Sequence, residues 1–394
     1  MRDMIYSETK PVKELGQKLG ELYEKRGFGE VVTPSLEYYD VFSFDSQTIP
    51  EENMFKLTDS SGRLVVLRPD NTTPIARIAA TRLKNASLPV KLYYDQNVYR
   101  ISRDYSGKRS EFTQTGVEII GGDTERADIE VVVTALRTLR EISAYFGGSV
   151  NYKLEIGHIG FCKAILDSLG LREEQLEIVR KYVGAKNSSS LEVMLGDRGD
   201  LDDVMNILSQ IPRLYGSREV LTTARSIGKG NEKACQALDY LEKIFDVLDE
   251  NGFSENISID LAIVNDMEYY TGIVFKGYLD YAGEPILGGG RYDTLLSNFD
   301  VDAPATGFGV NLSVISDKLS RAVGRSVPER KSVLVHYSDP SMLSKALNYM
   351  ENSGEVCVLS CFEELEKAIE YAKETKASKV VEITSGGIKE AYSL

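Results

Sequence analysis

The chain has 394 residues, of which 42% are hydrophobic and 27% are charged, so it is long enough for two or three folded domains. Its formal net charge of -14 disfavours a protein whose main role is to hold a nucleic acid, because such binding relies on lysine and arginine. No apolar run reaches the length of a membrane span, and polar residues follow Tyr6, so we expect a cytoplasmic protein. The cysteines lack zinc-type spacing, and we expect neither a metal nor a cofactor; they are Cys162, Cys235, Cys357 and Cys361.

Hydrophobic spacing predicts a mixture of helices and strands in the first part of the chain. Leucine and tyrosine recur at helical spacing from residue 10 to 26, and Gly27 stands where such a helix would stop. A strand is expected at 30–34, ending at a proline, and a hairpin turns at 59–62. The remaining predicted elements of this part are a turn at 68–74, a helix at 75–84, strands at 90–100 and 112–120, and a helix around 129–136.

The pattern changes in the middle of the chain. Residues 160–251 are almost entirely helical in pattern, which indicates a helical insertion. A polar segment at 321–330 is a candidate linker, and residues 331–394 alternate strand and helix as a small α/β domain. We therefore expect an α+β fold, whose core at 1–320 is an antiparallel sheet with flanking helices. Between the insertion and the linker, strands are predicted at 257–264, 272–278, 285–287 and 306–312, with a helix from Val314.

Several polar motifs occur in order along the predicted core. They are the helix and strand that end at Pro34, Leu-Arg-Pro-Asp-Asn-Thr at 67–72, Tyr-Arg at 99–100 with Phe-Thr-Gln-Thr-Gly-Val-Glu at 112–118, Glu-Tyr-Tyr-Thr-Gly at 268–272, and Gly-Gly-Gly-Arg-Tyr-Asp at 288–293. Taken singly, a motif such as Pro-Asp-Asn at 69–71 is also typical of an ordinary turn. In this order, the chain resembles the histidyl-tRNA synthetase family over most of residues 1–320. The resemblance implies a class II aminoacyl-tRNA synthetase fold and a homodimer interface within residues 10–42.

The resemblance also implies a pocket for an amino acid. A free α-ammonium needs carboxylate or amide oxygens, and an imidazole needs a donor, an acceptor and a stacking wall. The alternative, that the adjacent tyrosines at 269–270 supply one core and one surface residue, stays open. The histidine-binding residues implied by position are Asp70, Thr72, Gln114 and Glu118, the tyrosines Tyr269 and Tyr270, and Arg100 at the place of the second-motif arginine.

Amino-acid activation needs more than a pocket, because positive charge must surround the ATP phosphate oxygens during the reaction. The family's adenine-binding glutamate is matched here by Ser102, and its catalytic arginine is matched by Asn265. The glutamate and arginine of its third motif are matched by Ser313 and Val314. With four ionic groups missing, we expect no catalytic residues and no aminoacylation.

A histidyl-type body with eroded ATP-binding residues is similar to the family of ATP phosphoribosyltransferase regulatory subunits. This resemblance implies a non-catalytic subunit that assembles with the short-form catalytic subunit, enables the first step of histidine biosynthesis and lets histidine inhibit it. Residues 331–394 hold seven lysines, no arginine and ten acidic residues, so we do not expect tRNA binding.

Two other functions stay open at the level of the sequence. One is a divergent histidyl-tRNA synthetase, or another amino-acid-activating ligase, that uses Arg100 and Arg291. The other is a tRNA-binding protein without catalysis. The sequence also leaves open whether histidine occupies the inherited pocket or a contact with the catalytic subunit.

Overall fold

A computed structural model describes residues 3–5, 8–44, 49–101, 109–184, 202–263, 269–322 and 332–393. The chain divides into two compact units, Met1–Gly324 and Arg325–Leu394. Each unit has its own sheet and its own apolar core. None of the helices within the described ranges is both long enough and apolar enough to cross a lipid bilayer.

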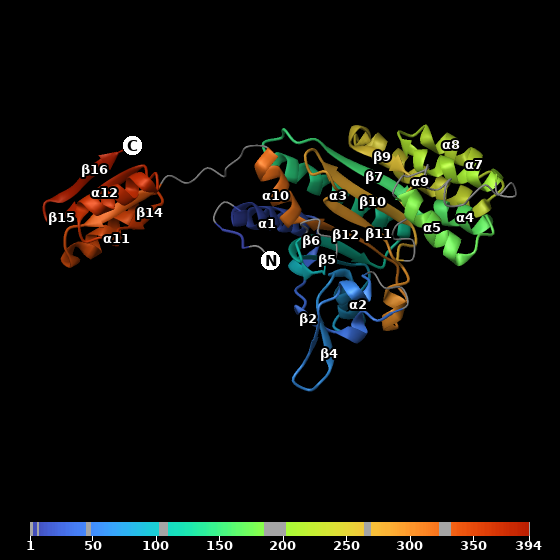
Figure 1. Ribbon diagram of the computed structural model, residues 1–394, viewed down its shortest axis with the longest axis horizontal. Coiled ribbons are helices and arrows are strands. Elements are labelled where there is room, and N and C mark those ends of the chain that lie inside the picture. Colours follow the sequence, from blue (N-terminus) through green and yellow to red (C-terminus); the bar gives the residue numbers. More distant parts are fainter. Residues whose placement is uncertain are drawn as a thin grey trace. The chain divides into compact units, whose positions relative to one another are not determined.

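The described residues of the first unit form a nine-stranded sheet (Figure 1). The neighbours β1–β5 and β7–β9 are parallel, and all other neighbours in this sheet are antiparallel. The predicted α+β class with an antiparallel-rich sheet is therefore confirmed. In spatial order the strands are β1 (Gly29–Glu30), β5 (Val90–Tyr99), β6 (Glu111–Ile120), β12 (Ala305–Asn311), β11 (Leu287–Arg291), β10 (Ile273–Leu279), β7 (Tyr152–His158), β9 (Ile257–Asp260) and β8 (Tyr215–Gly216).

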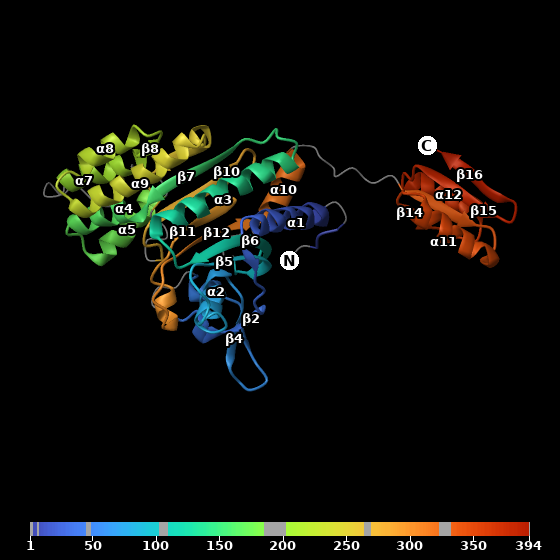
Figure 2. The same ribbon diagram turned by 180° about the vertical axis from the view of Figure 1, so that it is seen from behind.

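Helices cover both faces of this sheet. On one face lie α1 (Thr9–Lys25), α3 (Thr124–Tyr145) and α10 (Leu312–Ala322), which are seen in front in Figure 2. The apolar stripe of α1 is buried there, because Leu15, Leu19 and Tyr23 have no exposed surface. On the other face, α2 (Thr72–Ala80) packs Ile75 against Tyr94 and its neighbours.

The helical insertion follows β7 directly. Its helices α4 and α9 pack on each other, and α9 also contacts α3 and β7. Leu241, Ile244 and Leu248 of α9 are fully buried, so the insertion shares one continuous core with the sheet. The described helices of this region are α4 (Ile159–Ser168), α5 (Glu173–Gly184), α7 (Asp202–Gln210), α8 (Val220–Ile227) and α9 (Glu232–Glu250).

A separate three-stranded sheet contains the predicted hairpin. Its strands are β2 (Leu36–Tyr38), β4 (Leu64–Leu67) and β3 (Lys56–Thr58), in that order. One face buries Val66 against Phe42 and Met54. The short 3-10 helices of the described chain are η2 (Tyr39–Val41), η3 (Glu51–Asn53), η4 (Ile211–Arg213), η5 (Ser254–Asn256), η6 (Leu296–Phe299) and η7 (Pro340–Met342).

Several element boundaries differ from those predicted. The strand expected at 30–34 is only Gly29–Glu30, and the helix expected from residue 75 begins at Thr72. The strand expected at 285–287 instead runs through three glycines to Arg291. Glycine suits this strand because a Cβ on Gly290 would lie 2.5 Å from the carbonyl oxygen of Ile273.

The second unit is a small three-layer α/β fold. Its strands β13 (Val333–Tyr337), β14 (Cys357–Leu359) and β15 (Lys379–Thr384) are parallel, and β16 (Gly387–Ser393) adds an antiparallel edge. The helix α11 (Leu343–Asn352) packs on one face beside Val335, and α12 (Leu365–Glu374) packs on the other beside Leu334. Alternating side chains of β13 therefore pack into two separate small cores.

Candidate functional site

The residues expected to bind an amino acid gather on the sheet face that α2 covers. β6 carries Gln114 and Glu118 four residues apart, so both side chains point to the same face. Ile120 lies on that side of β6 and packs in the core under α2. At the start of α2, Thr72 donates a hydrogen bond of 2.9 Å from Oγ1 to Oε1 of Glu118.

Glycines on neighbouring strands leave room for these side chains. A Cβ atom on Gly307 of β12 would collide with Oε2 of Glu118. A Cβ on Gly309 would lie 2.6 Å from Nε2 of Gln114, and one on Gly116 would lie 2.6 Å from the hydroxyl of Tyr94. The spacing of the glycines therefore sets which polar side chains can lie flat over this face.

Glu118 is the centre of the site. It is 1% exposed, and its two carboxyl oxygens accept hydrogen bonds from the hydroxyls of Thr72 and Tyr292. Burial raises the pKa of Glu118 to about 8; these two hydrogen bonds oppose the shift and the charge of Asp70 adds to it. The site thus contains a buried carboxyl group with a pKa raised above its ordinary value.

Three tyrosines form an aromatic wall beside Glu118. The rings of Tyr269 and Tyr292 stack with centroids 5.4 Å apart and an angle of 11°. Tyr270 meets Tyr269 edge to face at 4.8 Å. Burial, followed by the charge of Glu118, raises the pKa of Tyr269 and of Tyr292 well above the ordinary value, so both hydroxyls remain hydrogen-bond donors at neutral pH.

Gln114 is held by an amide chain that the sequence did not single out. Asn71 donates from Nδ2 to Oε1 of Gln114 at 3.0 Å, and Gln96 donates from Nε2 to Oδ1 of Asn71 at 3.1 Å. The hydroxyl of Tyr94 also donates to Oε1 of Gln114, at 3.4 Å. Because Oε1 accepts these bonds, the orientation of the Gln114 amide is determined by its neighbours.

Asp70 and Arg100 form hydrogen bonds with backbone atoms of the same region. The carboxylate of Asp70 accepts from the backbone nitrogen of Thr73 at 2.8 Å and from its hydroxyl at 3.1 Å. Asp70 therefore stabilises the first turn of α2 as well as lying near Glu118. Arg100 donates from Nε to the carbonyl of Pro69 at 2.7 Å, with its guanidinium 5.5 Å from the ring centre of Phe112.

The positions that match the synthetase ATP-binding groups have local roles where the structure describes them. The hydroxyl of Ser313 accepts from the backbone nitrogen of Thr113 at 3.0 Å. The backbone nitrogen of Val314 donates to Oδ1 of Asn311 at 3.1 Å, which caps α10. Ser102 and Asn265 lie outside the described residues.

Arg291, which the ligase alternative would use, is held in a buried ion pair. Its Nε and Nη2 bind the two carboxylate oxygens of Asp128 at 3.1 and 2.9 Å. Its Nη1 binds Asp293 at 2.9 Å. The charge of Arg291 is thus balanced within the fold.

A family model described as Histidyl-tRNA synthetase matches residues 1–315 of this chain. A protein of Clostridium novyi (strain NT) is 35% identical over 398 residues, covering 100% of this chain and 93% of its own. It is named ATP phosphoribosyltransferase regulatory subunit. The chain belongs to the family of ATP phosphoribosyltransferase regulatory subunits.

Other members of this regulatory-subunit family have the same extent. A relative of that name from Clostridium acetobutylicum is 36% identical and covers 98% of this chain and 94% of its own. A crystal structure titled as a regulatory subunit/histidyl-tRNA synthetase from Bacillus halodurans C is 31% identical, with a TM-score of 0.83 over 98% of this chain and 97% of its own. Histidyl-tRNA synthetase from Nostoc sp. PCC 7120, at 20% identity and a TM-score of 0.76, shares the fold. The predicted family and class II fold are confirmed.

Sequence patterns did not identify every residue of the site around Glu118. Tyr292 bonds to Glu118, although the two are 174 residues apart in the chain. Asn71 and Gln96 orient Gln114. The signal for Tyr292 was present in the Gly-Gly-Gly-Arg-Tyr-Asp motif, whereas nothing local marks Gln96, whose role depends on the pairing of β5 with β6.

Proposed function

We propose that the protein is the non-catalytic regulatory subunit of an ATP phosphoribosyltransferase and acts in the first step of histidine biosynthesis. The observation that carries this proposal is full-length similarity, at 35% identity, to relatives that bear this name. The partner that the proposal requires is a short-form catalytic subunit, with which this chain forms a hetero-oligomer. Co-purification from the native cell tests this: recovery of a short ATP phosphoribosyltransferase supports it, and its absence under mild lysis contradicts it.

The effector that we propose for the pocket around Glu118 is free histidine. Oxygens of the buried Glu118 and of the half-buried Thr72 and Gln114 suit an ammonium or an imidazole N–H. Tyr269 and Tyr270 offer aromatic surface. Regulation then requires only that histidine bind one state of the assembly more tightly than another. A sensor of this kind keeps the amino-acid pocket of a synthetase without its reaction.

Inhibition and assembly together test the effector site. We expect Tyr270→Ala and Glu118→Ala each to weaken histidine binding and feedback inhibition, while the complex with the catalytic subunit still forms. Tyr281→Ala is a suitable control, because Tyr281 is 66% exposed. If both pocket variants match the wild type in calorimetry and in inhibition curves, histidine binds elsewhere, for example at a subunit contact.

Proton release provides a more specific test of the same site. At pH 7 the unoccupied Glu118 is mostly protonated, because its pKa is raised to about 8, and a bound cationic group favours the ionised form. Histidine binding should then release a proton, so the heat of binding should vary with the ionisation enthalpy of the buffer. Glu118→Gln should remove that variation, and an unchanged buffer dependence would exclude Glu118 as the group.

The family-model match on residues 1–315 also motivates a direct test of the enzyme alternative. Histidine-dependent exchange of pyrophosphate into ATP requires the adenylate to form, and we expect no exchange above background. Clear exchange would make the protein a divergent histidyl-tRNA synthetase. Filter binding of tRNA over a salt series would detect a tRNA-binding role through its steep salt dependence.

A further inference from the structure

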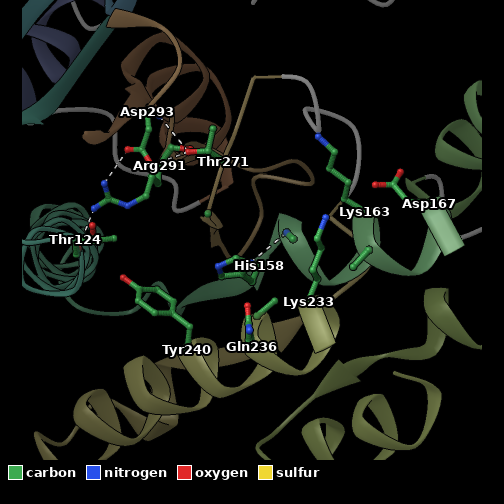
Figure 3. A pocket seen from close by; sticks show the side chains of 14 residues that line it. Thr124, His158, Lys163, Asp167, Lys233, Gln236, Tyr240, Thr271, Arg291 and Asp293 are labelled. Carbon is green, nitrogen blue, oxygen red and sulfur yellow. Dashed lines mark hydrogen bonds and ion pairs between the residues drawn. The ribbon is translucent and has the colours of Figure 1, made fainter. Parts of the chain in front are cut away.

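A second cavity lies at the junction of the helical insertion and the sheet (Figure 3). Its walls come from α4 and α9 on one side, and from the ends of β7 and β11, with Thr271 and Gly272, on the other. Its volume is about 420 Å³, which is within the range of small-molecule sites. None of the candidate histidine-binding residues lines this cavity.

On the sheet side of this cavity, the single positive charge of Arg291 lies between two carboxylates, those of Asp128 and Asp293. Arg291 binds Asp128 through two nitrogens, and Tyr240 donates to Asp128 at 2.6 Å. Asp293 accepts from Nη1 of Arg291 and from the hydroxyl of Thr271 at 3.1 Å. Since its side chain is 39% exposed, Asp293 retains oxygen lone pairs that a ligand hydroxyl can reach.

His158 lines the cavity and has a defined tautomer. The backbone nitrogen of Gly160 donates to Nδ1 of His158 at 3.1 Å, so the proton of the neutral ring is on Nε2. Burial and then the charge of Arg291 lower the pKa of His158 to about 4. At neutral pH the ring is therefore an uncharged N–H donor with a fixed tautomer.

The helical side of the cavity carries two exposed lysines. Lys163 of α4 and Lys233 of α9 lie across the cavity from Arg291, Thr271 and Asp293 (Figure 3). Among the described residues, neither lysine has an ion pair or hydrogen bond. Asp167 also lines the cavity, one turn from Lys163, but no salt bridge joins them. Both lysines are exposed, so a ligand in the cavity can reach their ammonium groups.

We propose that this cavity binds a small phosphate ester that carries hydroxyl groups, such as a sugar phosphate. Two ammonium groups match the charge of a phosphate monoester, which is close to -2 at neutral pH. Lys163 and Lys233 hold the phosphate, and His158 donates from Nε2 to one of its oxygens. Asp293 and Asp167 disfavour a bare polyanion and accept hydrogen bonds from the ligand hydroxyls.

Titration with glucose 6-phosphate tests the proposal, using calorimetry and the phosphorus-31 line width of the ligand. We expect saturable binding by the full chain. Lys163→Ala and Lys233→Ala should each weaken binding about tenfold, since each removes one charge-assisted hydrogen bond. Lys229→Ala is the matched control: Lys229 is exposed in the same insertion, does not line the cavity, and should have no effect.

Two further ligands test whether binding requires both the phosphate and the sugar hydroxyl groups. Unphosphorylated glucose should not bind, and inorganic phosphate should bind more weakly than glucose 6-phosphate because it cannot use Asp293. Equal binding by citrate would overturn the assignment to phosphate esters. Failure to bind any phosphate at millimolar concentration, or wild-type affinity in both cavity lysine variants, would overturn the site itself. Histidine titration and thermal unfolding of the variants check that they remain folded.

Discussion

Glu118 is a carboxyl group that the fold buries in its neutral form. Its raised pKa of about 8 means that the native state holds a proton that the unfolded chain releases above its ordinary value of 4.5. The neutral carboxyl therefore favours folding below pH 4.5, and this contribution is lost as the pH rises through 8. At neutral pH, burial of Glu118 therefore lowers the free energy of unfolding.

This linkage predicts a pH-dependent gain in stability for Glu118→Gln. Glutamine resembles the protonated form: its oxygen can accept from the hydroxyl of Thr72 or Tyr292, and its NH2 group can donate to the other hydroxyl. Relative to the wild type, the free energy of unfolding of the variant should rise from pH 5 to pH 8, by at most about 1.4 kcal/mol per unit, and then level off. Urea unfolding at pH 5, 6.5 and 8 measures this difference in the free energy of unfolding. A difference that does not change with pH would contradict the raised pKa of Glu118.

Tyr292 is predicted to matter for ligand binding through its hydroxyl rather than through its ring. Tyr292→Phe keeps the stack on Tyr269 but removes the donor to Glu118. A lost hydrogen bond to a buried group costs about 1–2 kcal/mol, so histidine affinity should fall about 5- to 30-fold. Calorimetry checks this, with exposed Tyr281→Phe as the control. Unchanged affinity would show that the ligand does not depend on how Glu118 is held.

At the scale of elements, the pocket depends on how closely β6, β12 and β11 approach one another. Gly307 pairs with Glu118 and Gly309 pairs with Gly116 on the neighbouring strand β6. The side chains of Glu118 and Gln114 lie where a Cβ atom on Gly307 or Gly309 would be. At Gly307 an added Cβ would also meet the backbone carbonyl of Val117. At Gly309 the three nearest atoms belong to the side chains of Gln114 and Tyr94, which can shift.

This difference predicts that Gly309→Ala damages the pocket while the protein still folds. The methyl group should displace Gln114, weaken histidine binding about tenfold, and lower the free energy of unfolding by about 1–3 kcal/mol. Gly288→Ala is the matched control on β11, because a Cβ there meets no atom within 4 Å. Calorimetry and urea unfolding compare the two variants. Equal effects of both substitutions would mean that strand stability, and not pocket shape, was altered.

At the scale of the whole molecule, a homodimer through residues 10–42 remains a prediction. The apolar stripe of α1 is used within its own chain, so it is not available to a second copy. Apolar surface is exposed instead beyond the helix, at Val32, Leu36 and Tyr38, which are 74%, 51% and 43% exposed. Leu57 pairs across β4 on the same face as Tyr38 and is 45% exposed. This face is the part of the region that a partner copy can bury.

Leu36→Asp should therefore convert the dimer to a monomer without unfolding it. A charge at the centre of an apolar contact is costly when buried, whereas Leu36 is half exposed in the single chain. Sedimentation velocity at micromolar concentration measures the change, and Tyr281→Asp on another exposed surface is the control. A wild-type protein that sediments as a monomer would contradict the predicted interface.

Sequence patterns predicted most of the elements and the family, although several boundaries differ in the structure. Helical spacing from residue 10 to 26, the turn at 59–62 and the long helical insertion act through near neighbours in the chain, so local pattern is enough to reveal them. The ordered motifs then identified the family and the class II fold, which the comparisons confirm. They also pointed to Thr72, Glu118 and Tyr269, which the structure brings close together.

The hydrogen bonds that join those residues depend on contacts between distant parts of the chain. The bond of Tyr292 to Glu118 spans 174 residues and depends on strand register. The bond of Arg291 to Asp128 spans 163 residues and depends on the packing of α3 against β11. Register also decides that the glycines continue β11 instead of ending it, because neighbouring strands occupy the places where a Cβ on Gly289 or Gly290 would lie. Burial, which gives Glu118 its raised pKa, is likewise a property of the packed sheet and helix and not of the residues beside it in the chain.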